Sequence, residues 1–318
     1  MPDRTPPKIA ELPRPDTREG TPRRVGVEIE LGGLEERRVA EIAADTLGGE
    51  IGLGGEKGFV VQGSAAGDLE IYLDTALLKR PEGWLGESLH SVARTVVPVE
   101  IVTSPIAPAD IAALDRLLGA LHAAGATGTA SGLFAGYGVH FNPEVVSTDL
   151  SDVQPVLSAY AFCEDALRRE MEIDIARRAL PFVDPYPRAL LDGLAKGVIP
   201  DMAALIDLYL ERAPSRNHGL DMLCLFAHID RDRVAQKLDL SSIAARPTFH
   251  YRLPDCRIDE PDWSLALEWN RWVRIERIAE DSGLVRELAR EWRAHRDSLT
   301  SVRGDWTRKV AARLGDVA

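Results

Sequence analysis

The chain has 318 residues, 45% of them apolar and 28% charged, an ordinary balance for a globular protein able to bury a large core. Its 38 basic and 50 acidic residues give a formal charge of −12, which argues against nucleic acid as the main partner because phosphate binding needs a basic stripe. Three scattered cysteines, no apolar signal-peptide core and no membrane-length run predict a cytoplasmic protein with no disulfide framework, structural zinc site or membrane partner.

Proline and charged residues dominate residues 1–22, which are expected to form a flexible N-terminal arm. The remaining residues, 23–318, are expected to fold as a single domain. Apolar periodicity predicts, in chain order, a strand at 24–31, a helix at 34–47, strands at 58–62, 67–74 and 96–106, a helix at 109–124 and a strand at 137–145. A mostly helical block at 151–238 is followed by a strand at 246–255 and by helical stretches at 262–281 and 284–313.

This order of elements bears on the fold class. Strands cluster early, a helical insertion follows, and one strand returns late. An α+β fold is therefore expected, with a mainly antiparallel sheet flanked by helices, rather than a regular βαβ alternation.

The first predicted strand, VGVEIEL, carries two acids among apolar residues. Successive side chains of a strand point to opposite faces, so Glu28 and Glu30 share one face and the apolar residues the other. Similar polar faces recur on later strands. Their members are Glu70 and Asp74, then Glu100, then His140 and Asn142, and finally His250 and Arg252.

Carboxylates gathered in this way repel one another and raise each other's pKa unless a cation lies between them. Oxygen ligands with an imidazole suit Mg²⁺ or Mn²⁺ better than a thiolate-selected metal. A metal beside Arg252 is what an ATP-dependent reaction needs, because both neutralise the transferred phosphoryl group. Simpler interpretations stay open: Glu-x-Glu is commonly a solvated strand face, His140 can be a hydrogen-bonded core residue, and Arg252 can pair with Asp255 or Asp259.

Six segments together resemble the amidoligase family, a branch of the carboxylate–amine ligase group with a glutamine synthetase-like fold. They are VGVEIEL (25–31), GDLEIYLD (67–74), VEIVTSPI (99–106), GYGVHFNP (136–143), SRNHGLDMLCLF (215–226) and PTFHYRLPD (247–255). The resemblance implies a curved, glutamine synthetase-like sheet in a single catalytic domain at 23–318. It also implies ADP-forming synthesis of an amide or isopeptide bond through an acyl phosphate.

The implied partners are ATP as co-substrate, Mg²⁺ or Mn²⁺, and a carboxylate and an amine supplied by an amino acid, a peptide or a small molecule. Relatives with this fold often assemble, so a homo-oligomer is an open expectation. The roles implied by position are metal binding by Glu28, Glu30, Glu100 and either Glu70 or Asp74; metal and phosphate contact by His140 with Asn142; and phosphate contact by Arg252 and, more weakly, Arg216. Arg252 and Glu100 are the expected catalytic residues.

One position departs from the family pattern. Related ligases often place a metal-binding Glu two residues before the last-strand arginine, where this chain has His250. Either His250 serves as a differently tuned metal ligand or the chain has lost activity. A catalytically decayed, ligase-fold binding or scaffold protein therefore stays open as one alternative. A second is a metal-dependent amide hydrolase that uses the same carboxylates without ATP.

Overall fold

The computed structural model describes residues 6–54, 58–73, 97–129, 137–173, 183–298 and 302–315. In these residues the strands form one antiparallel sheet in the order β2-β3-β4-β5-β1-β6. The strands are β1 Val25–Leu31, β2 Glu50–Leu53, β3 Phe59–Ser64, β4 Gly67–Leu73, β5 Val99–Thr103 and β6 Val139–Pro143. The predicted α+β class and antiparallel sheet are confirmed. The sheet is not strongly curled, and likeness to the glutamine synthetase fold stays a prediction.

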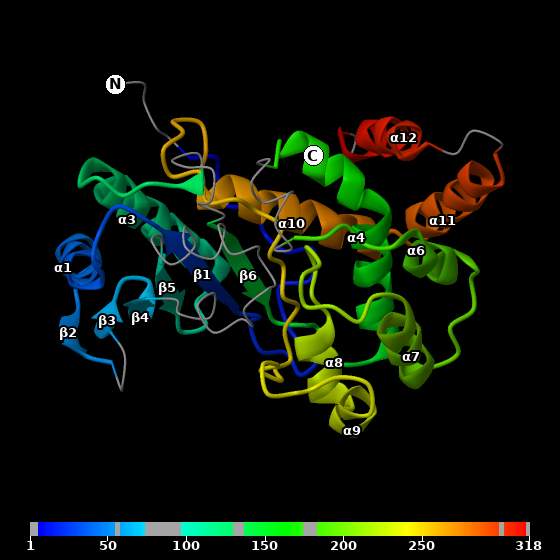
Figure 1. Ribbon diagram of the computed structural model, residues 1–318, viewed down its shortest axis with the longest axis horizontal. Coiled ribbons are helices and arrows are strands. Elements are labelled where there is room, and N and C mark those ends of the chain that lie inside the picture. The colour runs from blue at the N-terminus through cyan, green and yellow to red at the C-terminus, as the bar shows by residue number, and fades with distance from the viewer. Residues whose placement is uncertain are drawn as a thin grey trace, which may run out of the picture.

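Figure 1 shows two halves of the molecule along its longest axis. The sheet, α1 and α3 lie in one half, and α4, α6, α7, α11 and α12 lie in the other. The bounds of the helices are α1 Glu36–Leu47, η2 Pro108–Asp110, α3 Ile111–Ala123, α4 Leu150–Glu170, α6 Arg188–Ala195, α7 Met202–Arg212, α8 Leu223–Ile229, α9 Arg231–Ala235, α10 Leu265–Glu280, α11 Ser282–Asp297 and α12 Arg303–Gly315. The stretch predicted at 284–313 is two helices, because Ser298 is extended and ends α11.

One face of the sheet belongs to the core. Val25, Val27, Ile29 and Leu31 of β1 are fully buried, while the residues between them are half-buried. On β6, the ring centroid of Phe141 lies 5.8 Å from the ring centroid of Trp269 in α10. The period-2 pattern therefore divides β1 into a core face and a polar face, as the sequence predicts.

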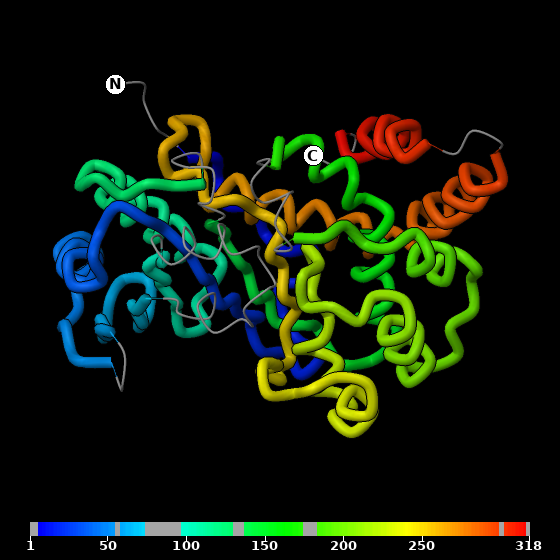
Figure 2. Tube along the Cα trace, in the orientation of Figure 1, coloured from blue at the N-terminus to red at the C-terminus, as the bar shows by residue number. Residues whose placement is uncertain are grey.

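The segment predicted as a strand at 246–255 runs beside β6 without forming a regular strand, as the close course of the two segments in Figure 2 indicates. It makes isolated bridges from Thr248 to Glu144 and from Tyr251 to Phe141. Pro247 and Pro254 interrupt the ladder, since proline has no backbone N–H to donate. The strand prediction is wrong in this respect, although the segment occupies the edge where a further strand would lie.

Residues 6–22 lie along α10 and α4. Ala10 donates its N–H to Asn270 Oδ1 at 2.8 Å, and Trp269 Nε1 donates to the Ala10 carbonyl at 2.9 Å. Farther along, Arg14 Nη1 is 2.8 Å from Asp152 Oδ1. The structure supplies these contacts, and the flexibility expected of the arm stays a prediction.

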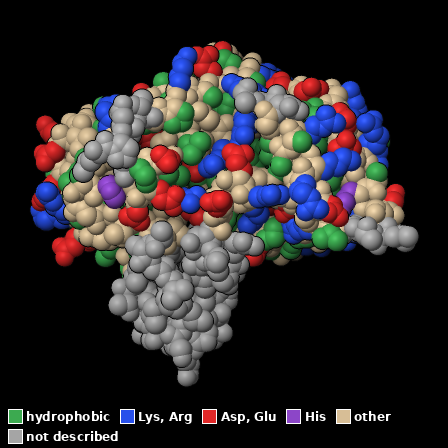
Figure 3. Space-filling view, turned by 90° about the horizontal axis from the view of Figure 1, so that it is seen from above, with side chains coloured by type: hydrophobic (Ala, Val, Ile, Leu, Met, Phe, Trp, Pro, Cys, Tyr) green, Lys and Arg blue, Asp and Glu red, His purple; other side chains and the backbone are tan. Residues whose placement is uncertain are grey.

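The described surface mixes charges of both signs. On the face shown in Figure 3, acidic and basic side chains are interspersed over the described residues. Within the same described residues, no helix combines the length and the apolar character that crossing a bilayer requires.

Candidate active site

Strand pairing gathers the predicted polar residues on one face of the sheet. In the β1–β6 ladder Glu28 lies opposite His140 and Gly26 opposite Asn142. In the β1–β5 ladder Glu30 lies opposite Glu100. Directly opposed residues of antiparallel strands project to the same side, so these side chains share the face turned away from the apolar core. Their roles as ligands stay a prediction.

The carboxylate of Glu28 is the centre of a hydrogen-bonded group. Its Oε2 lies 2.8 Å from His140 Nδ1, and its Oε1 accepts a hydrogen bond from Asn142 Nδ2 at 2.8 Å. Burial alone would raise the pKa of Glu28, but the hydrogen bond with His140 and the positive charge of Arg246 hold this pKa well below its usual value. Glu28 is therefore an anion at neutral pH.

Arg246 also belongs to this hydrogen-bonded group, although it was not predicted from the sequence. Its Nη2 donates to Asn142 Oδ1 at 2.6 Å and lies 3.5 Å from Glu28 Oε1. A signal for it exists in the sequence: in an extended segment, Arg246 shares a face with His250 and Arg252 through two-residue spacing.

His250 extends the group away from the sheet. The centroid of its ring lies 5.3 Å from that of the His140 ring, at an interplanar angle of 80°. Its Nδ1 lies 3.3 Å from Asp221 Oδ2. Burial lowers the pKa of His250 to about 4, despite the opposing effect of the Asp221 contact. The imidazole is therefore neutral at neutral pH and available as a metal ligand or hydrogen-bonding group.

Asp221 is fully buried and was also missed. Burial alone would raise its pKa, but the His250 hydrogen bond and the charge of Arg216, whose Nε lies 3.4 Å from Asp221 Oδ2, keep the pKa of Asp221 below its usual value. Asp221 belongs to a segment that carries the family resemblance. Nothing in the local pattern distinguishes it from a surface acid.

Glu30 and Glu100 form a second acidic position on the same face. Glu30 Oε2 accepts a hydrogen bond from the Gly138 N–H at 2.7 Å. Tyr72 of β4 lies opposite Glu100 in the next ladder. Two carboxylates at directly opposite positions destabilise a sheet unless their charge is offset, and a role of this pair in metal binding stays a prediction.

Glu70 lies apart from Glu28 on the sheet. Glu70 is exposed and lies opposite Val102, which in turn lies opposite Glu28. One strand therefore separates the two glutamates, a backbone separation of about 10 Å at the usual strand spacing. Asp74 lies outside the described residues.

Arginines border the group. Arg252 Nη1 donates to the Arg216 carbonyl at 2.5 Å, and its backbone N–H donates to the Gly219 carbonyl at 2.9 Å. The side chain of Arg216 is about one-third exposed, at 36%. The two predicted phosphate-contacting residues thus lie together, with Arg246 as a third guanidinium nearby on the Glu28 side.

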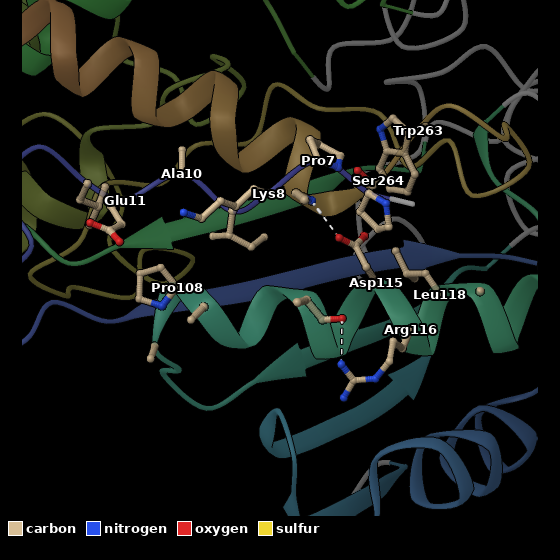
Figure 4. A pocket seen from close by; sticks show the side chains of 18 of the residues that line it. Pro7, Lys8, Ala10, Glu11, Pro108, Asp115, Arg116, Leu118, Trp263 and Ser264 are labelled. Atoms are coloured by element: carbon tan, nitrogen blue, oxygen red, sulfur yellow. Dashed lines mark hydrogen bonds between the residues drawn. The ribbon is translucent and has the colours of Figure 1, made fainter. Parts of the chain in front are cut away.

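A separate cavity of about 1030 Å³ is formed by the arm, α3 and the segment leading into α10. In Figure 4, Lys8 and Glu11 of the arm line one side of this cavity. Asp115 of α3 and Trp263, which precedes α10, line its other sides. Glu28, His140 and His250 do not line it. This cavity and the polar cluster on the sheet are therefore different features.

Fold and cluster together define an α+β protein that gathers carboxylates, imidazoles and guanidinium groups on one side of an antiparallel sheet. A family model described as "Putative amidoligase enzyme" matches residues 21–274. The chain belongs to this family, whose name implies amide-bond ligation. No curated protein and no solved structure matches the chain.

Proposed function

We propose that the protein is an ATP- and Mg²⁺-dependent carboxylate–amine ligase that forms an amide or isopeptide bond and releases ADP. The observation that carries the proposal is the cross-strand pairing of Glu28 with His140 and of Glu30 with Glu100, in a chain of the amidoligase family. The expected substrates are a carboxylate and an amine supplied by an amino acid, a peptide or a small molecule.

The donor set fits a hard divalent ion. Glu28, Glu30 and Glu100 provide carboxylate oxygens on one face, and His140 adds an imidazole. Glu28, His140 and His250 also place one potential ligand atom each within 4.8 Å of one another. Mg²⁺ or Mn²⁺ held by these residues would neutralise phosphate charge.

The chain's own residues bind and orient the phosphates. Arg252 and Arg216 are assigned to the transferred phosphoryl group and Asn142 to the nucleotide side of the cluster, because guanidinium forks bind phosphate oxygens in a defined geometry. Arg252 offsets the charge that gathers as an oxygen of the substrate carboxylate bonds to the γ-phosphorus and the bond to ADP breaks. The product of this step is an acyl phosphate.

The second step replaces phosphate by the amine. The amine nitrogen attacks the carbonyl carbon, the carbon–oxygen bond to phosphate breaks, and the nitrogen loses a proton. Glu100 is assigned as the carboxylate that accepts this proton. Phosphorylation is required because the oxygen of a free carboxylate is a poor leaving group.

The test is ADP formation measured with a panel of carboxylates and amines. ADP release should require ATP, divalent metal and both substrates, and Glu30→Gln, which keeps an oxygen to accept the Gly138 hydrogen bond, should abolish it. Glu50→Gln is the matched control, since Glu50 is an exposed strand acid at the far edge of the sheet. If folded, metal-loaded protein neither binds nor hydrolyses ATP, the ligase proposal is wrong.

His250 favours one second candidate, a nucleotide-binding protein on a decayed ligase fold. Burial keeps His250 neutral, so it does not supply the negative charge of the expected acid. Calorimetry separates the two candidates. Nucleotide binding that needs no metal and survives both Glu28→Ala and Glu30→Ala would support the decayed protein.

A further inference from the structure

A second group of potential metal ligands lies behind the sheet cluster. Asp221, Cys224 and His250 are all buried, and each places one potential ligand atom within 4.8 Å of the others. The sequence spacing of the cysteines does not indicate this group, because folding alone brings α8 beside the segment that holds His250.

The two segments are joined through their backbones. The Asp221 N–H donates to the His250 carbonyl at 2.9 Å, and the Arg246 N–H donates to the Cys224 carbonyl at 3.2 Å. Asp221 Oδ1 also accepts the Leu223 N–H at 2.9 Å. These bonds fix the carboxylate and the two neighbouring side chains relative to one another without using Asp221 Oδ2.

We propose that Asp221, Cys224 and His250 bind a divalent transition metal of the zinc class, at a position next to the Mg²⁺ site on the sheet, with which it shares His250 as a candidate ligand. A thiolate, an imidazole and a carboxylate are the donor types of protein zinc sites, and a thiolate selects against Mg²⁺. The site does not depend on ligase activity, and its occupancy can be measured without nucleotide.

The hydrogen bonding of His250 supports the site. Its Nε2 is buried and has no hydrogen-bond partner among the residues that the structure describes. Among these same residues, its Nδ1 has only the 3.3 Å contact with Asp221, which is long for a hydrogen bond to a carboxylate. A buried imidazole with one unpartnered nitrogen and one long contact costs stability, and a metal ion bound to one of these nitrogens would reduce that cost.

Two groups must change when the metal binds. Arg216, at 3.4 Å from Asp221 Oδ2, is one-third exposed and can turn toward solvent once its Nη1 releases the Ser242 carbonyl. Burial, with the charge of Asp221, raises the pKa of Cys224 to about 11, so the thiol releases its proton to solvent as the metal–sulfur bond forms. Metal affinity should therefore increase with pH.

The test is titration of the full-length, metal-free protein with Co²⁺, the spectroscopic substitute for Zn²⁺, in the absence of nucleotide. The expected result is a near-ultraviolet sulfur-to-cobalt charge-transfer band that saturates at one Co²⁺ per chain and is abolished by Zn²⁺. Cys224→Ala should remove the band, and Asp221→Asn should weaken Co²⁺ binding by about tenfold or more.

The chain offers matched controls in its two other buried cysteines. Cys163→Ala and Cys256→Ala should keep the band, because neither residue belongs to a ligand group within the described part of the chain. Circular dichroism checks that each variant is folded. Glu28→Gln changes a candidate ligand of the neighbouring sheet cluster and should also keep the band. Co²⁺ binding without the band, a band that survives Cys224→Ala, or no binding would overturn the site. A band without ATP turnover would reject the ligase proposal alone.

Discussion

Glu28 and His140 face each other across the β1–β6 ladder, and Oε2 of Glu28 lies 2.8 Å from Nδ1 of His140. The pair joins a strand near the N-terminus to one more than a hundred residues later. Because Asn142 and Arg246 contact the same carboxylate, Glu28 is the residue through which most of the polar cluster is connected.

Glu28→Gln is therefore expected to reduce ATP-dependent ADP release by about a hundredfold or more, the usual scale for loss of a charged group that acts on the transition state. The amide keeps the size of the side chain and one hydrogen-bond acceptor, so circular dichroism should be unchanged. Steady-state ADP release measures the effect, with Glu50→Gln as the control. Wild-type turnover in Glu28→Gln would show that this carboxylate takes no part in the reaction.

Arg246 places a fixed positive charge beside the same carboxylate, at 3.5 Å from Glu28 Oε1. A guanidinium here repels a divalent cation on Glu28. Arg246→Ala is expected to lower the Mg²⁺ concentration for half-maximal ATP binding by about threefold to tenfold, a Coulomb effect reduced by solvent and salt.

Mg²⁺ titrations at fixed ATP measure this change. Arg116→Ala is the control, since Arg116 is an exposed arginine on α3 and lines the separate cavity. An unchanged or higher Mg²⁺ requirement in Arg246→Ala would contradict the placement of the metal next to Glu28.

Polar and apolar residues alternate within β1 itself, so both faces of this strand could be predicted from the sequence alone. β2 could not be predicted, because all four of its residues are exposed and its sequence shows no alternation of polar and apolar residues. The edge segment at 246–255 has the β-branched and aromatic residues of a strand in Thr248, Phe249 and Tyr251, yet Pro247 and Pro254 withhold two ladder donors.

The polar cluster was predictable only where it follows from strand faces. Glu28 and His140 were each expected on the polar face of a strand, and the pairing that brings them together depends on strand order, which periodicity does not encode. Asp221 and Arg246 reach the cluster from outside the sheet. Only tertiary packing shows that a buried acid before α8 lies against His250.

Arg23 and Glu276 form a buried, bidentate ion pair between the start of the sheet and α10. The two side chains are 1% and 4% exposed, with two nitrogen–oxygen distances of 2.8 Å. Arg23→Met would leave Glu276 as an uncompensated buried charge, so the free energy of unfolding should fall by about 3–5 kcal/mol. Urea denaturation measures it.

The double variant Arg23→Met with Glu276→Leu distinguishes charge from packing. Replacing both partners removes the uncompensated charge, so the double variant should be more stable than Arg23→Met alone. A double variant that loses the sum of both single effects would mean that the pair acts through packing and not through charge.

Asp115 joins α3 to the start of α10 and gives stability a pH dependence. Its two oxygens accept the N–H groups of Leu265 and Ala266 at 2.7 and 3.1 Å, yet burial raises the pKa of Asp115 to about 6. Between the unfolded value near 4 and about 6, the folded state holds the proton that the unfolded state has lost. The contribution of Asp115 to stability is therefore present below pH 4 and is lost as the pH rises through 6.

Asp115→Asn removes this titration while keeping one oxygen acceptor. Its melting temperature relative to the wild-type protein should increase from pH 4 to pH 7, with the free-energy difference changing by about 1–3 kcal/mol. Thermal melts of both proteins across this range measure the change. Asp110→Asn, a variant of another acid beside the start of α3, is the control. A difference that stays constant with pH would mean that Asp115 has an ordinary pKa in the folded protein and that its two hydrogen bonds offset the effect of burial.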